Sequence, residues 1–226
     1  MKTHQRKKRV FDRKLYKKSA LKQIKGQRFV LCLTWLLSAC VLYIIYTSYK
    51  RISSCFGNGF VFALAFALGL AGIFVFAQFV LYLAIFYKKE DITFDTFFKG
   101  FEMWLPGIFA MLWYSLFVAL WGILLIIPGI VKSFAYSQMF WIIAENPGIS
   151  VKKAMAVSKI MTKGHKADLF SMLLSFSGWG ILAIIPCGLG LIFLVPYIMA
   201  SYCNAYFDLK RMAILEGRLT PADFAA

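Results

Sequence analysis

The chain has 226 residues, of which 61% are hydrophobic and only 16% are charged, and its formal net charge is +16. A soluble protein of this length could not cover so much apolar surface with so few charged side chains. The composition therefore excludes an ordinary soluble domain and predicts an integral membrane protein of the all-α class.

Residues 1–28 form a basic segment, and residues 29–207 then hold four apolar regions. A spanning helix needs about 20 residues, so the first two regions each fit one helix. The last two are about twice as long, and Pro128-Gly129 and Pro186-Cys187-Gly188 divide them into hairpins. We predict a polytopic transmembrane bundle of six helices, followed by a tail at 208–226. The predicted helices are about 29–49, 59–87, 104–127, 130–145, 168–185 and 189–207.

The positive charges predict the orientation of this bundle. Of the 26 Lys and Arg residues, all but Lys50, Arg51 and Lys132 lie in the segments that are cytoplasmic when the N-terminus is inside. Loops rich in Lys and Arg remain on the cytoplasmic side of a membrane. We expect a multi-pass protein of the cell membrane with the N- and C-termini in the cytoplasm. The anionic lipids of the inner leaflet are the expected partners of the basic tail, with no specific nucleic acid.

An amphipathic helix is predicted at 150–163, between the fourth and fifth spans. Its apolar side carries Val151, Ala154, Met155, Ser158 and Met161, whereas its lysines lie elsewhere. A basic amphipathic helix of this kind lies in the inner interface or docks a cytoplasmic partner. The candidate surface for these contacts consists of Lys152, Lys153, Lys159, Lys163, His165 and Lys166.

Two stretches of nine residues, 121–129 and 179–187, nearly coincide in sequence, and each ends the first helix of a predicted hairpin. A Lys-Gly pair precedes each of three hairpins, at Lys25-Gly26, Lys99-Gly100 and Lys163-Gly164. Lysine suits the C-terminal end of a helix, and glycine tolerates the left-handed cap that follows it. We predict three hairpin repeats in parallel orientation, each preceded by an interfacial helix.

Polar side chains in the apolar regions are the candidates for a ligand site. Lys132 either extends to lipid phosphates at the surface or, if the Pro128-Gly129 break dips into the bilayer, is a buried cation that needs an anionic ligand. Neutral polar residues are expected in the cytoplasmic halves of three different helices, where they line a cavity or join helices by hydrogen bonds. The candidate ligand or lipid contacts are Lys132, Tyr136, Gln138, Gln78, Asn204 and Tyr202.

Catalytic and metal-binding patterns are not found in the sequence. It has no HExxH, GxSxG or P-loop motif, and its five cysteines show no CxxC spacing. We therefore expect no enzyme activity, no cofactor and no metal site. Cys55 and Cys187 both fall in predicted outer loops, which leaves a disulfide between them open.

The chain has several distinctive local motifs: IIPGIVKSFAYS at 126–137, Glu145-Asn146-Pro147, Gly164-His165-Lys166, the stretch 175–179 and Pro196-Tyr197. In these motifs it resembles a bacterial family known as domain of unknown function 975. Members often have Asp where this chain has Glu145. The resemblance implies a multi-pass membrane protein without an assigned activity.

Two functions remain open from the sequence. The first is a non-enzymatic membrane component that binds lipid or a protein partner, as the basic interfacial helices indicate. The alternative is a carrier or exporter of a small or lipid-like anion, as the repeats, the helix breaks and Lys132 indicate.

Overall fold

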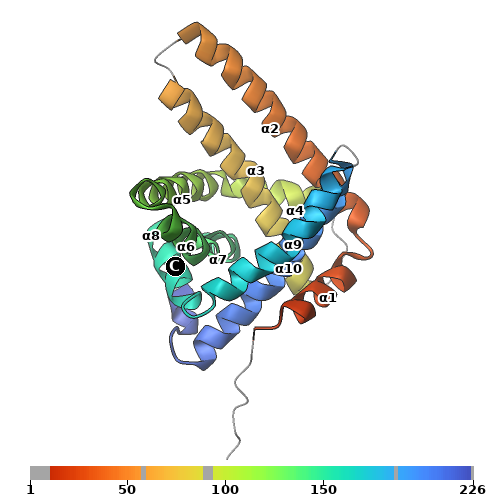
Figure 1. Cartoon of the computed structure of the whole chain (residues 1–226), viewed down its shortest axis with the longest axis vertical. Coiled ribbons are helices and arrows are strands. Elements are labelled where there is room, and N and C mark those ends of the chain that lie inside the picture. Colours follow the sequence, from red (N-terminus) through yellow and green to blue (C-terminus); the bar gives the residue numbers. More distant parts are fainter. Residues whose placement is uncertain (1–10, 57–59, 89–93, 186–187, 225–226) are drawn as a thin grey trace, which may run out of the picture.

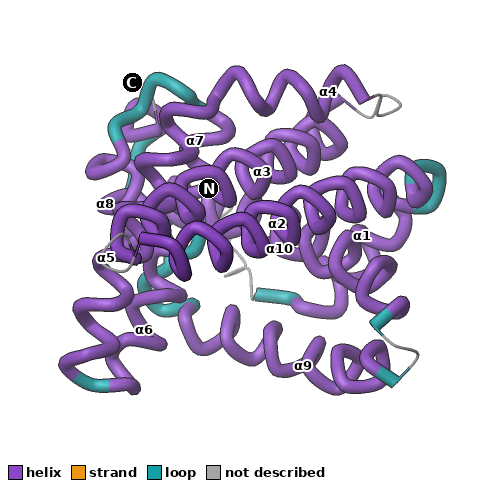
Figure 2. The backbone as a smooth tube through the Cα atoms, turned by 90° about the horizontal axis from the view of Figure 1, so that it is seen from above, coloured by secondary structure: helices purple, strands orange, loops and turns teal. Residues whose placement is uncertain are grey.

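A computed structural model describes residues 11–56, 60–88, 94–185 and 188–224, and every regular element in these ranges is a helix. Figure 2 shows this helical backbone, with the α5–α6 hairpin on one side and α1 on the other. The elements are α1 (Arg13–Ile24), α2 (Arg28–Phe56), α3 (Phe60–Lys88), α4 (Phe94–Lys99), η2 (Gly100–Met103), α5 (Trp104–Leu124), α6 (Ile126–Tyr136), α7 (Met139–Glu145), α8 (Val151–Met161), α9 (Lys166–Ile184), α10 (Leu189–Leu215) and η3 (Pro221–Phe224).

Four helical stretches in the described chain are long and apolar enough to cross a membrane: Arg28–Arg51, Phe97–Leu124, Lys166–Ile184 and Gly190–Leu215. Gly72–Tyr87 is a shorter apolar stretch. The all-helical class and the multi-pass character are therefore supported. The predicted ranges for five of the six helices overlap α2, α3, α5, α9 and α10, whereas the range 130–145 corresponds to parts of two helices, α6 and α7.

Helix α3 lies at the centre of the molecule and packs against α2, α5, α7 and α10. Its upper half forms, with α2, a hairpin that projects from the other helices (Figure 1). Tyr82 is 1% exposed in the lower half, where its hydroxyl accepts a hydrogen bond of 3.0 Å from the indole N–H of Trp35 on α2. Phe79, one turn earlier on α3, packs edge-to-face on Trp141 of α7. The buried aromatic side chains of α3 thus form the middle of the core.

Close contact between backbones sets the position of α3 against η2, which leads directly into α5. A Cβ atom placed on Gly100 would lie 2.5 Å from the Cα atom of Ala77. Small residues at such crossings let helices approach closely, which van der Waals packing then stabilises. A second close crossing occurs in the α9–α10 hairpin, where a Cβ on Gly190 would lie 2.7 Å from the Cα of Ala183.

The break between α5 and α6 occurs at Leu125, three residues before the predicted Pro128-Gly129 break. Leu125 is extended, with φ −160° and ψ 133°, and Pro128 lies in the first turn of α6. Proline is tolerated there because the first N–H groups of a helix have no intrahelical acceptor. The predicted fourth helix is also interrupted at Ser137 and Gln138, which separate α6 from α7.

A short helix precedes each of the three hairpins, in the order α1 before α2–α3, α4 before α5–α6, and α8 before α9–α10. Of the three predicted glycine caps, Gly164 has the left-handed conformation, with φ 88°. Gly26 and Gly100 do not have a positive φ. Ser150 is the N-cap of α8, because its hydroxyl accepts a hydrogen bond of 3.3 Å from the backbone N–H of Lys153.

We predict that Gly100→Ala lowers the free energy of unfolding by about 1–3 kcal/mol, because the added methyl group meets backbone that cannot move without separating α3 from α5. Thermal unfolding in a mild detergent measures the change. Gly178→Ala is the matched control, because nothing lies within 4 Å of a Cβ at this position in α9. Alanine there is expected to be neutral or stabilising. Equal stability of Gly100→Ala and the wild type would contradict this account of the crossing.

Candidate functional site

A cluster of hydrogen-bonded side chains joins the ends of α3, α7 and α10. The carboxylate of Glu145, at the end of α7, accepts hydrogen bonds from the hydroxyls of Tyr87 and Tyr206. The ammonium of Lys210 lies 2.7 Å from both carboxylate oxygens. The side chains of Glu145 and Lys210 are 11% and 20% exposed, so water screens their charges only in part. We call these four residues the Glu145 cluster.

The surroundings of the Glu145 cluster are apolar. The ring of Phe207 packs edge-to-face on Tyr87, and the ring of Trp141 stacks on Tyr206. The ammonium of Lys210 also lies 4.5 Å from the ring centroid of Phe224 in η3. Separating the helices would leave the carboxylate or the ammonium buried without its partner, which costs free energy. The pair therefore holds the helices together.

Helix α1 packs against α10 and runs alongside α9, and polar contacts hold it at both ends. The hydroxyl of Tyr16 donates a hydrogen bond of 2.5 Å to Asp208 of α10. Burial raises the pKa of Tyr16, and the adjacent charge of Asp208 raises it further. Near the other end of α1, the amide groups of Gln23 and Asn204 hydrogen-bond each other at 2.9 and 3.3 Å.

Contacts from α1 to α9 complete this attachment. The ammonium of Lys17 lies 2.7 Å from the hydroxyl of Ser175 and 3.9 Å from the ring centroid of Phe176. Burial lowers the pKa of Lys17, as does the positive charge of Arg13. The guanidinium of Arg13 in turn donates to the backbone carbonyl of Ser171 at 3.4 Å.

The predicted polar residues of the membrane region each make separate contacts. Gln78 donates to Ser38 on α2 at 3.1 Å, whereas Gln138 donates to the adjacent Ser137 at 3.1 Å. The side-chain carbonyl oxygens of both glutamines are buried and accept no hydrogen bond from the described residues. Asn204 contacts α1 as described above.

The two tyrosines predicted with these residues lie on α10 and α6. The hydroxyl of Tyr202 donates to the backbone carbonyl of Leu169 on α9 at 3.3 Å. Tyr136 is buried at the end of α6. The adjacent carbonyl of Ala135 accepts hydrogen bonds from the hydroxyls of Ser158 and Thr162, at 2.8 and 3.3 Å, which joins α6 to α8.

Lys132 is half-buried on α6, and its ammonium lies 4.3 Å from the ring centroid of Trp121 on α5. A cation over an indole face is attracted by the ring quadrupole. Lys159 of α8 and Lys166 of α9 are near enough to repel it. Three cations from three helices therefore converge on this side of the molecule.

The lysines of the predicted interfacial surface lie on the outer face of α8. Lys152, Lys153, Lys159 and Lys163 are exposed, whereas Ala154, Met155, Val157, Ser158 and Met161 are buried beneath them. His165 and Lys166 are half-buried at the start of α9, where the imidazole of His165 lies 3.0 Å from the Asp168 carboxylate. The predicted amphipathic character of this helix is therefore present in the structure.

An arginine that the sequence did not single out fixes the end of α8. The guanidinium of Arg218 donates to the backbone carbonyls of Ile160 and Lys163, at 2.9 and 3.1 Å. The carbonyl of Ile160 belongs to the last turn of α8 and that of Lys163 lies just beyond it, where cationic donors are favourable. The C-terminal segment thus holds α8 in place.

The predicted Cys55–Cys187 pair lies outside the side chains that the structure describes. Among the residues searched, no group of three or more His, Cys, Asp or Glu side chains could hold a metal ion.

A family model described as "Protein of unknown function (DUF975)" matches residues 27–213. The chain belongs to this family, as its motifs predicted. No curated protein and no solved structure matches the chain significantly.

We predict that Glu145→Ala lowers the free energy of unfolding by about 2–3 kcal/mol, because the ammonium of Lys210 and two hydroxyls lose their acceptor. The free energy is measured in detergent with a chemical denaturant. Glu102→Ala, which removes an exposed carboxylate of η2, is the control and should change it by less than about 0.5 kcal/mol.

Replacing Glu145 and Lys210 together by Leu should recover most of the loss, since no charge then remains buried. Equal stability of Glu145→Ala and the Glu102→Ala control would show that the Glu145 cluster contributes nothing to the assembly of these helices.

Proposed function

We propose that the chain is a non-enzymatic component of the cell membrane that binds anionic lipid, or an acidic protein partner, at its cytoplasmic face. The observation that carries this proposal is the form of α8. Its apolar face is buried, its last turn is held by Arg218, and its lysines are exposed. A fixed row of cations attracts phosphate headgroups, each Lys or Arg near the surface contributing about 1 kcal/mol.

In the proposed orientation, both termini are cytoplasmic and six segments cross the membrane as three hairpins in parallel orientation. Helix α6 has 11 residues, a length of about 16 Å, which is about half of the hydrocarbon thickness. We therefore assign the fourth crossing to α6 and α7 together, inclined in the membrane. The short helix before each hairpin supports the repeat, and the basic outer face of α8 supports the cytoplasmic placement of that helix.

A carrier of small or lipid-like anions is the second candidate function. Two observations favour it. The first is the interruption at Ser137–Gln138, where the side-chain carbonyl oxygen of Gln138 is buried without a donor among the described residues, and the second is the convergence of Lys132, Lys159 and Lys166. Interrupted helices expose backbone and polar groups to substrates in many transporters. This function predicts flux of an anion in reconstituted vesicles, which a binding component does not show.

For the orientation, we predict that a cysteine at position 50 reacts with a membrane-impermeant thiol reagent in intact cells, whereas one at position 163 reacts only after permeabilisation. The variants Lys50→Cys and Lys163→Cys are made in a chain whose five native cysteines are replaced by alanine. The opposite pattern of labelling would overturn the proposed orientation.

For the function, we predict that the full chain, extracted gently from its own membrane, retains anionic phospholipid or one stoichiometric protein partner in native mass spectrometry. The triple variant Lys152→Gln, Lys153→Gln, Lys159→Gln should retain several-fold less, because it lacks three exposed cations of α8. The variant Lys14→Gln, Lys18→Gln, Lys22→Gln removes the same charge from exposed positions of α1 and serves as the comparison, which should retain more than the α8 variant does. The proposal would be contradicted if the mass spectra showed the protein with only bulk membrane lipid, or if both triple variants retained equal amounts.

A further inference from the structure

An apolar groove of about 450 Å³ opens between the end of α1, the start of α2, and the α9–α10 hairpin. This volume lies within the range of about 300–1,000 Å³ that is typical of small-molecule sites. Leu21 and Ile24 of α1 form one wall, and Trp179, Phe193 and Tyr197 form the opposite side. The close crossing of Gly190 and Ala183 closes the groove between α9 and α10.

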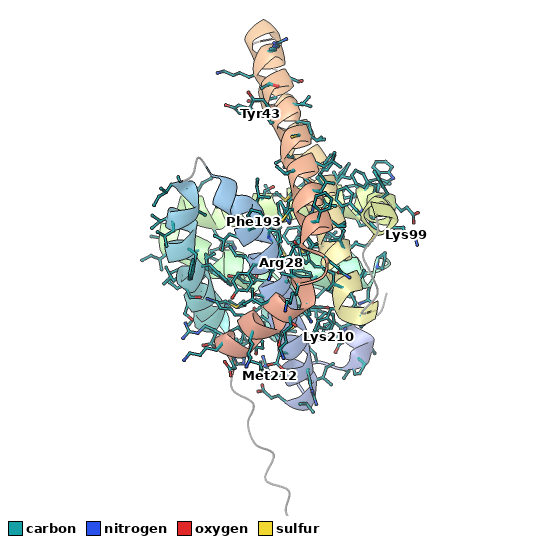
Figure 3. The ribbon with its side chains drawn as sticks, turned by 90° about the vertical axis from the view of Figure 1, so that its right-hand side faces the viewer. Arg28, Tyr43, Lys99, Phe193, Lys210 and Met212 are labelled. Atoms are coloured by element: carbon teal, nitrogen blue, oxygen red, sulfur yellow. The ribbon has the colours of Figure 1, made fainter. Side chains whose placement is uncertain are left out.

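Arg28 is the one charged residue in the lining of this groove, and it lies near Phe193 in Figure 3. Its side chain makes no hydrogen bond or ion pair with the described residues, whereas Arg13 and Arg218 do. A guanidinium always carries its charge, and its planar set of donors matches a phosphate in two parallel hydrogen bonds. Arg28 is exposed, so its guanidinium is accessible to an anionic group that enters beside the apolar wall.

The mouth of the groove is apolar as well. Trp179, Leu182 and Phe193 are 63%, 56% and 67% exposed, although their side chains are large and apolar. Contiguous apolar surface of this kind marks contact with lipid or a partner. A ligand for this groove must combine a flexible apolar chain with an anionic group at one end. A rigid partner helix would contact the mouth without filling the space behind it.

We propose that the groove binds one phospholipid with an anionic headgroup, its phosphate on Arg28 and one acyl chain between α1 and the α9–α10 hairpin. This inference rests on the proposed lipid-binding function and adds a defined site, separate from the lysines of α8. Because Leu21 and Ile24 belong to α1, the bound lipid also holds α1 against α9 and α10. Lipid binding then stabilises the chain by mass action.

The test uses the full chain in an uncharged detergent, with phosphatidylglycerol as the probe and phosphatidylcholine of the same acyl chains for comparison. Native mass spectrometry should show one phosphatidylglycerol bound at low lipid concentration, and thermal unfolding should shift upwards. Arg28→Gln should weaken this binding about tenfold and remove the preference over phosphatidylcholine, because the bidentate contact is lost. Lys22→Gln, an exposed cation of α1 outside the lining, is the control for charge.

A second pair of variants tests the apolar part of the site. Leu21 is 47% exposed and lines the groove, whereas Leu15 is 56% exposed on α1 and does not. Leu21→Trp should fill the groove and abolish the one-to-one binding, whereas Leu15→Trp should leave it unchanged. Both positions are exposed, so neither substitution enlarges a buried side chain.

Two outcomes separate this inference from the proposed function. If Arg28→Gln and Leu21→Trp bind phosphatidylglycerol as the wild type does, while the α8 triple variant loses lipid, the groove site is wrong and the proposed function stands. If the groove variants lose the one-to-one lipid and the α8 triple variant loses nothing, the groove is the lipid site and the proposed role of α8 fails. Equal binding by all variants overturns both.

Discussion

The pairing of Glu145 with Lys210 is the constraint on which the arrangement of the helices depends. Its donors come from the ends of α3 and α10, and the carboxylate from the end of α7. Burying a carboxylate in apolar surroundings costs free energy unless every donor stays in place. The pairing therefore holds these three helix ends together. Helix α3 also packs against α2 and α5. Holding the end of α3 in place therefore also positions the other hairpins.

The helices themselves could be predicted from the sequence, because apolar stretches in lipid must satisfy their backbone hydrogen bonds internally. The position of a break was less predictable. Pro128 indicated one, but proline is tolerated in a first turn, and the chain bends at Leu125 instead. The buried stripe of α1, Tyr16, Ala20 and Ile24 at a spacing of four, was a readable signal that this helix packs against another.

The partners of the polar side chains could not be predicted. Tyr87, Tyr206 and Lys210 lie 58 to 65 residues from Glu145, and local sequence does not show which helix faces meet. Gln78 and Asn204 join helices by hydrogen bonds, one of the two roles that the sequence left open, but their partners, Ser38 and Gln23, were not predicted. The groove at Arg28 was missed for the same reason, because four helices contribute to its lining and no single segment carries a signal.

The position of α1 limits how the α9–α10 hairpin lies in a bilayer. Arg13 and Lys17 contact Ser171 and Ser175, and Leu21 shares the groove with Trp179, so α1 follows α9 in the same direction.

The outer face of α1 is charged, with Lys14, Lys18 and Lys22 exposed. A charge at the bilayer centre costs about 2.5–3.5 kcal/mol, so in the proposed orientation we place α1 at the level of the headgroups. The proposal then inclines α9, which follows α1, as it crosses the membrane, with exposed apolar side chains such as Leu174 and Ile181 towards the acyl chains. In this proposed position the guanidinium of Arg28 lies among phosphates and the groove beside it opens to lipid, as the proposed binding of an anionic phospholipid requires.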